Sequence, residues 1–202
     1  MMKVNQNTVE LWGVANAKPC LSHENHGQRF YKFPLRVERL SGLSDVPNVV
    51  VSERELQRLP IDAGKPLRVC GQLRSFNNKS GQGSRLVITV LAQELSEGDG
   101  TFYNHIALSG VLCKQPYLRR TPLGRSICDV ILAVNRRYGR ADYLPCIAWG
   151  QVASTVSRMS VGDRLSLDGR VQSRTYTKLT DDGPQERVAF EVSIMQLTEQ
   201  EG

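Results

Sequence analysis

Arginine and aromatic side chains alternate with small residues in the stretch GRVQSRTY, residues 169–176. If this stretch is extended, one face of the strand carries four larger side chains, namely Arg170, Gln172, Arg174 and Tyr176. A guanidinium group contacts phosphate, and an aromatic ring is a flat surface on which a base can stack. The row therefore predicts a surface that follows a polyanion with exposed bases.

Two other stretches carry the same residue types. NRRYGR, residues 135–140, places Arg136 and Arg137 beside Tyr138, and YLPCIAWG places Tyr143 and Trp149 on one face of a predicted strand. Each has a structural alternative. The tryptophan can belong to a core, Tyr176 can cover a barrel edge, and NRRYGR can be a solvated turn. The functional interpretation depends on the joint occurrence of these residues on faces that the inward apolar residues leave free.

The chain repeats itself. NTVELWGV, residues 7–14, aligns with NHIALSGV, residues 104–111, at an offset of 97 residues, and the offset becomes 98 where Gly71 aligns with Gly169. A nearly constant offset over most of the chain indicates tandem copies of one unit. We predict an N-terminal domain over residues 1–95, a linker over 96–103 and a C-terminal domain over 104–198, with the polar stretch ELSEGDGTF marking the connection.

Each copy shows the same order of predicted elements: three strands, one helix and two strands. In the second copy, period-two alternation predicts strands, and Val152, Val156 and Met159 predict a short helix within residues 151–159. We expect a turn region over 113–125 and a loop over 177–186. This order is that of the five-stranded OB barrel, and a mid-strand glycine at 71 and 169 suits its sharply bent strand. The predicted fold is therefore all-β, with two tandem five-stranded OB-fold barrels and one short helix per repeat; an unrelated β-sandwich is the alternative.

Composition allows an ordinary core and favours a polyanionic partner mildly. The 202 residues are 40% hydrophobic and carry a net charge of +6. Residues 101–202 contain eleven arginines and two lysines, and arginine both stacks on bases and forks to phosphate. The five widely spaced cysteines predict free, buried thiols in a reducing cytoplasm. The N-terminal MMKVNQNTVELWG has no apolar core of a signal peptide, so we expect a cytoplasmic, nucleoid-associated protein without a membrane contact.

Long stretches of the second copy resemble the bacterial single-stranded DNA-binding protein family. They are NHIALSGVLCKQPYLRRTPLGRSICDVILAVNRR, CIAWGQVASTV, VGDRLSLDGRVQSRTY and RVAFEVSIMQL, within residues 104 to about 197. The resemblance implies single-stranded DNA binding in replication, recombination or repair. It also implies base stacking at Tyr138, Tyr143, Trp149 and Tyr176. Because such assemblies usually contain four OB folds, it implies a homodimer for a chain with two; a monomer is the alternative.

The first copy departs from this pattern. At the matching offsets it has Ser41, Val46, Ser52 and Asn78 in place of the four aromatic residues. Phe76 lies nearby, with Arg74 and Arg68 on the same predicted outward face. We therefore expect a depleted binding face in the N-terminal fold. The chain stops at TEQEG, so recruitment of replication or recombination proteins through an acidic C-terminal tip is not expected.

The sequence lacks recognisable catalytic motifs. It contains no P-loop, no zinc-ligand cluster and no Ser-His-Asp spacing, and His23, Glu24 and His26 are interpreted as part of a solvated turn. We predict no enzyme activity, no cofactor and no metal, and instead sequence-nonspecific binding of single-stranded DNA. Ten residues are predicted to contact the nucleic acid: Tyr138, Tyr143, Trp149, Tyr176, Arg136, Arg137, Arg170, Arg174, Arg74 and Phe76.

Two alternatives to this function stay open. A primosomal or recombination accessory protein can keep the barrel and act mainly through protein–protein contacts. RNA is the second alternative partner, because stacking and charge do not distinguish the two sugars.

Overall fold

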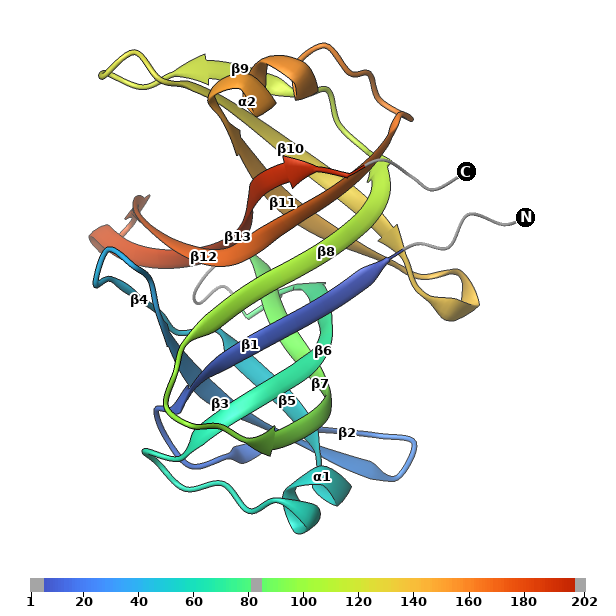
Figure 1. Cartoon of the computed structure of the whole chain (residues 1–202), viewed down its shortest axis with the longest axis vertical. Helices are drawn as coiled ribbons and strands as arrows, with labels where there is room; N and C mark the ends of the chain where they lie inside the picture. The colour runs from blue at the N-terminus through green and yellow to red at the C-terminus, as the bar shows by residue number, and fades with distance from the viewer. Residues whose placement is uncertain (1–5, 81–84, 199–202) are drawn as a thin grey trace. The chain divides into compact units, whose positions relative to one another are not determined.

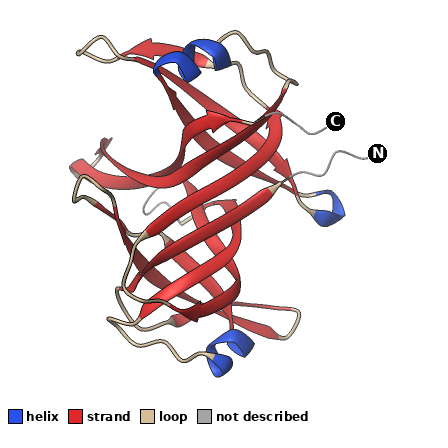
Figure 2. Ribbon diagram, in the orientation of Figure 1, coloured by secondary structure: helices blue, strands red, loops and turns tan. Residues whose placement is uncertain are grey.

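A computed structural model describes residues 6–80 and 85–198. Strands make up most of the chain, and the helices are short (Figure 2). Two compact units interleave along the sequence. The N-terminal unit consists of Thr8–Arg74 and Ile88–His105, and the described residues of the C-terminal unit are 6–7, 75–80, 85–87 and 106–198. Residues 75–80 and 85–87, which come from the first repeat, thus belong to the C-terminal unit. No helix in the described part of the chain is long and apolar enough to cross a membrane.

The first repeat forms a barrel (Figure 1). Its strands are hydrogen-bonded in the order β3-β5-β7-β6-β1, and β1 returns to pair with β3. The short strand β2 extends β3 as a hairpin, and β4 pairs with the end of β3. The elements are β1 Asn7–Ala15, β2 Cys20–Asn25, β3 Gln28–Glu38, β4 Ser44–Asp45, β5 Asn48–Ser52, α1 Glu53–Arg58, β6 Pro66–Asn77 and β7 Leu86–Glu97.

The second repeat forms the same barrel. Its strands follow the order β8-β12-β13-β11-β10, and β10 closes the barrel by pairing with β8. The elements are β8 Tyr103–Leu112, β9 Tyr117–Arg120, β10 Ser126–Asn135, η1 Arg137–Gly139, β11 Ala141–Trp149, α2 Gly150–Val156, β12 Arg164–Thr180 and β13 Gly183–Leu197. In each repeat the helix follows the third barrel strand, so the prediction of two tandem OB folds is confirmed.

A glycine in the fourth barrel strand permits its bend in both repeats. A Cβ atom on Gly169 would lie 2.4 Å from the carbonyl oxygen of Ser193, and one on Gly71 would lie 2.1 Å from that of Leu91. β12 pairs with β8 as far as Gly169 and with β13 from Leu167 onward, and the register shifts between Asp168 and Gly169. The glycine therefore lies where one strand serves both sides of the barrel, as the sequence predicts.

Several predicted boundaries of the second repeat were wrong. The predicted loop 177–186 is the end of a long hairpin, in which only Asp181 and Asp182 separate β12 from β13. The predicted turn region 113–125 contains β9, which pairs with the start of β10. The helix ends at Val156, so Met159 lies beyond it, and the buried helical residues are Ala153 and Val156. Between the repeats, residues 98–102 lie outside the strands.

Two predictions for the first repeat were also wrong. The SHENHG segment is mostly the exposed strand β2, and the turn is confined to His26 and Gly27, which have positive φ angles. Cys20 and Cys70 are exposed, whereas Cys128 and Cys146 are buried as predicted and Cys113 is intermediate. All five cysteines lie in the described ranges and are free. Cys20 is exposed because β2 packs neither of its faces into the core.

Candidate nucleic-acid interface

The candidate surface is the outward face of β9 to β13 in the C-terminal unit. Val171, Val192 and Cys146 register across three neighbouring strands, and all three are buried in the core. Because side chains alternate along a strand, the neighbours of these residues point outward. On this face Arg174 lies opposite Ala189, and Tyr176 lies opposite Arg187.

The structure places the four predicted aromatic rings on or beside this surface. Tyr143 and Trp149 are 50% and 39% exposed on β11, whereas Ile147 between them is buried. Tyr176 is half-buried on β12. Tyr138 is 99% exposed in the turn between β10 and β11, where its backbone has a φ of 67°. All four rings are therefore at least partly accessible for stacking.

Three of the four predicted arginines of the second repeat are exposed. Arg170 and Arg174 project from β12, and Arg137 lies in the turn with Tyr138. The Nε atom of Arg174 lies 3.6 Å from a carboxylate oxygen of Glu191, which also accepts a 3.1 Å hydrogen bond from Gln172. The Arg174 side chain is still more than half exposed, so its charge stays accessible to solvent and to a phosphate.

Arg136 is the exception. Its Nε donates a 2.7 Å hydrogen bond to Asp142, and its Nη2 contacts the other oxygen of the same carboxylate. Asp142 is fully buried. The first repeat has the same fork, in which Arg39 donates to Asp45 at 2.7 and 2.6 Å. The fork is thus a structural feature that both repeats share. Phosphate contact by Arg136 stays a prediction, because the same guanidinium is already bound to Asp142.

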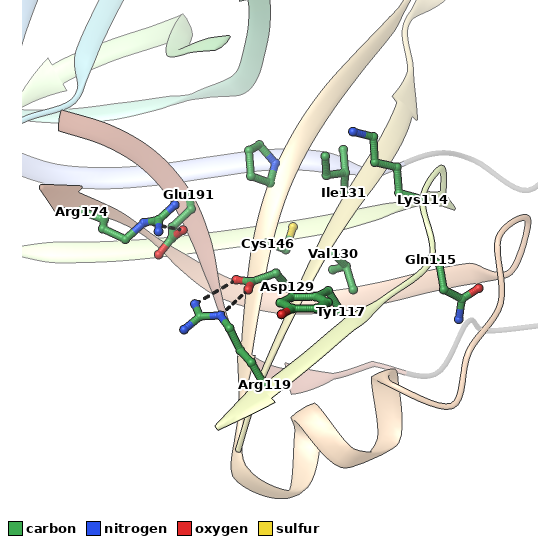
Figure 3. Close-up of a pocket in the computed structure, with 11 residues that line it drawn as sticks. Lys114, Gln115, Tyr117, Arg119, Asp129, Val130, Ile131, Cys146, Arg174 and Glu191 are labelled. Atoms are coloured by element: carbon green, nitrogen blue, oxygen red, sulfur yellow. Dashed lines mark hydrogen bonds and ion pairs between the residues drawn. The ribbon is translucent and has the colours of Figure 1, made fainter. Parts of the chain in front are cut away.

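A hollow of about 400 Å³ is lined by residues of β9 to β13 and of the segment before β9 (Figure 3). Arg119 on β9 and Arg174 on β12 approach it from different strands, each beside a carboxylate (Figure 3). The lining residues are Lys114, Gln115, Tyr117, Arg119, Asp129, Val130, Ile131, Pro145, Cys146, Arg174 and Glu191. The lining therefore combines three basic groups and two acidic groups with an aromatic ring.

Sequence reasoning missed the contribution of β9 to this hollow. Tyr117 is largely exposed, and Arg119 donates a 2.6 Å hydrogen bond to Asp129 on β10. That bond raises the pKa of Arg119 above its ordinary value, so the guanidinium keeps its charge. The spacing of Tyr117 and Arg119 by two residues was the available signal, because such a pair shares one face of a strand.

The two predicted residues of the first repeat belong to different units. Phe76 is 52% exposed and lies in the segment that belongs to the C-terminal unit. Arg74 lies in the N-terminal unit, where it donates a 2.6 Å hydrogen bond to Gln72.

In the N-terminal unit, Arg68 and Trp12 contact each other. The Arg68 guanidinium lies over the Trp12 ring, 4.3 Å from its centroid, and also pairs with Asp99 at 3.0 Å. The Trp12 ring centroid lies 4.9 Å from that of Tyr103. These contacts leave Trp12 half-buried, in an environment unlike that of the exposed rings of the second repeat.

The histidine segment has a structural role in the hairpin. The His23 ring stacks on Phe30 across the β2–β3 hairpin, with a centroid distance of 5.0 Å. Among residues 6–80 and 85–198, no group of three His, Cys, Asp or Glu side chains is placed to hold a metal ion.

The C-terminal repeat is similar in sequence to known proteins. Residues 103–198 match the model of the single-strand binding protein family. The C-terminal half of the chain is therefore similar in sequence to this family. It is 39% identical over 80 residues to a single-stranded DNA-binding protein of Clostridium tetani, which covers 36% of this chain and 55% of that protein. Single-stranded DNA-binding protein A of Bacillus subtilis is 36% identical over 80 residues, covering 36% of this chain and 46% of that protein. The chain thus spans about half the length of the curated relatives it matches.

Structural comparison extends the similarity to both repeats. The wild-type single-stranded DNA binding protein of Thermus aquaticus superposes with a TM-score of 0.79 and 23% identity, covering 96% of this chain and 93% of that chain. A deletion mutant of the same protein gives a TM-score of 0.77 over 98% of this chain and 95% of that chain, at 24% identity. At this identity the similarity shows the fold, which comprises both barrels.

Proposed function

We propose that the protein binds single-stranded DNA without sequence preference, mainly through the outward face of its C-terminal unit. One observation carries the proposal: two exposed rings and two exposed guanidinium groups share one face of the C-terminal barrel, which matches the single-strand binding protein family. They belong to Tyr143, Trp149, Arg170 and Arg174. Each stacked base contributes about 1–3 kcal/mol, and every base has a ring face, so stacking tolerates any sequence.

The arginines in the hollow have a defined part in this function. Arg119 and Arg174 each lie beside a carboxylate when DNA is absent. A phosphate competes with that carboxylate for the guanidinium, and both arginine side chains are about a third or more exposed, so exchanging one anion for another costs little. Affinity should fall as salt rises, because bound DNA releases counterions.

The biological setting belongs to the same proposal. A protein that coats single strands without reading sequence serves replication, recombination and repair, and it needs no catalytic group. We propose that the chain forms a homodimer with four OB folds, acts in the cytoplasm on the nucleoid, and meets replication or recombination proteins there. Light scattering of the free protein should give about twice the chain mass of 22.6 kDa. The monomer mass would contradict the dimer.

The fluorescence of Trp149 tests the binding mode directly. In a Trp12→Phe background, Trp149 is the remaining tryptophan. Titration with a dT oligomer at low salt should quench its emission because the ring stacks on a base, and the quench should weaken at high salt. An unchanged signal with saturating dT would contradict the proposed function. An RNA oligomer of equal length, used as competitor, measures how far the site prefers DNA.

A further inference from the structure

The end of β6 is held within the C-terminal unit by a buried cluster of hydrogen bonds. The Ser75 amide donates to Asp142 at 2.7 Å, and the Tyr143 amide donates to the Ser75 hydroxyl at 2.7 Å. Arg136 donates to the Ser75 carbonyl at 3.1 Å and to both oxygens of Asp142. We call this arrangement the Asp142 clamp and define it by Ser75, Arg136, Asp142 and the backbone of Tyr143.

The clamp satisfies a buried carboxylate with hydrogen bonds. Asp142 is fully buried and Ser75 is nearly so. A buried carboxylate is tolerated when it is paired and hydrogen-bonded, and here it accepts from two guanidinium nitrogens and one backbone amide. The hydrogen bonds that involve Ser75 join it to residues more than sixty positions away in sequence. They fix the backbone of Ser75 beside that of Tyr143, whose side chain is exposed.

Phe76 directly follows the clamped residue. Because side chains alternate along a strand, the buried Ser75 sends the next side chain to the opposite face, and Phe76 is indeed exposed. Its backbone directly follows that of Ser75, whose hydroxyl accepts a hydrogen bond from the Tyr143 amide. Two exposed rings, from segments far apart in sequence, thus extend from backbones that the Ser75–Tyr143 hydrogen bond brings close together.

We propose that Phe76 is an additional base-stacking ring of the C-terminal binding surface, positioned there by the Asp142 clamp. Its ligand is a base of the single strand next to the base on Tyr143. Phe76 contacts the nucleic acid, whereas Ser75, Arg136 and Asp142 are positioning residues. This inference rests on the proposed function and deepens it, since a residue from the first repeat would contribute to the binding surface of the second.

A tryptophan reporter in place of Phe76 tests the stacking role. In a Trp12→Phe, Trp149→Phe background, Phe76→Trp leaves one tryptophan, and its emission should be quenched by a dT oligomer. Adding Asp142→Asn should remove most of that quench. Asp45→Asn is the matched control, because it breaks the corresponding Arg39 fork in the N-terminal unit and should leave the quench unchanged.

The outcomes separate the two proposals. If dT quenches Trp149 in its own reporter background but leaves the Phe76→Trp reporter unchanged, the further inference is overturned and the proposed function stands. If neither reporter is quenched, the proposed function fails. Equal quenching of the Phe76→Trp reporter with and without Asp142→Asn leaves Phe76 a stacking ring and overturns the clamp.

A second set of variants guards against misfolding. Ser75→Ala removes the acceptor for the Tyr143 amide and keeps the Arg136–Asp142 pair, so the barrel should stay folded. Phe76→Ala should weaken dT binding about fivefold or more in the wild-type chain, as expected for loss of one stacked base. In the Ser75→Ala chain the same change should cost less than about twofold, because coupled residues are not additive. Equal losses in both chains would contradict the clamp.

Discussion

Position 149 shows how a capping side chain can be replaced by an exposed ring. The equivalent Ser52 is the N-cap of α1, and its side chain accepts a 3.3 Å hydrogen bond from the Glu55 amide. Trp149 occupies the N-cap position of α2 and makes no such bond. Loss of a capping side chain typically costs about 0.5–2 kcal/mol, so the second repeat gives up helix stability at the position where it gains an exposed ring.

Ring and charge should affect DNA binding differently. Trp149→Ala should weaken affinity about fivefold or more, the loss of one stacked base, and leave the salt dependence unchanged. Arg170→Ala should weaken affinity and lower the slope of log K against log salt by about 0.7, the value for one phosphate contact on a single strand. Binding isotherms at several salt concentrations measure both quantities. Arg158→Ala, outside the surface, is the control and should change neither; an altered slope in Trp149→Ala would contradict the assignment.

The cysteines should differ strongly in reactivity. Burial raises the pKa of the thiols of Cys146 and Cys128, and the thiolate is the reactive form. Cys20 lies on the exposed strand β2. At pH 8 an alkylating reagent should therefore modify Cys20 first, and Cys128 and Cys146 only after unfolding. Peptide mass spectrometry of timed samples measures the order, and labelling of Cys146 at the rate of Cys20 would contradict the burial.

Among the elements, those that bury apolar residues were predictable. Period-two alternation located the barrel strands, because their inward residues form the core. The alternation failed for β9 and for the outer half of the β12–β13 hairpin, which the sequence predicted as turn and loop. Both segments are largely exposed, so cross-strand pairing rather than burial maintains them. Hydrogen bonds between main chains leave no hydrophobic pattern, and the hollow beside β9 was missed for this reason.

The bend of β12 predicts a strong effect of one methyl group. In Gly169→Ala the new Cβ would lie 2.4 Å from the Ser193 carbonyl oxygen, so β12 and β13 must separate. We expect the free energy of unfolding to fall by about 1–3 kcal/mol, as for an overpacked core. Denaturant unfolding measures it. Thr175→Ala, exposed on the same strand, should have a small effect, and an unchanged stability in Gly169→Ala would contradict the close approach.

Across the whole molecule, comparing the two repeats distinguishes residues that the fold requires from residues that differ on the outward surface. Both copies keep the bend glycine and the Arg–Asp fork of the turn. Aligning the two copies of the sequence revealed the glycine, because the bend constrains a single backbone position. They did not reveal that Ser75 joins the fork of the second repeat, because a contact between distant segments has no local pattern. The candidate rings were predictable from the sequence, whereas the clamp required the structure.

The first repeat therefore supplies a design for removing the proposed binding surface while keeping the barrel folded. Tyr138→Ser, Tyr143→Val and Trp149→Ser together install the residues that Ser41, Val46 and Ser52 provide in the first copy, where the same fold forms around them. Thermal melting should show a folded protein. None of the three replaced rings is buried in the core, and a serine in place of Trp149 restores an N-cap. Loss of three stacked bases should weaken dT binding at least about a hundredfold.

The reciprocal change distinguishes the two units further. Three substitutions, Ser41→Tyr, Val46→Tyr and Ser52→Trp, place rings on the N-terminal barrel. In an otherwise unchanged chain they should raise the affinity for dT, because the added rings stack further bases.

The triple variant of the C-terminal unit has a contradicting outcome. If it kept the affinity of the parent chain while staying folded, the C-terminal face would not be the main site. The N-terminal barrel, with its Trp12–Arg68 contact, would then have to carry the binding.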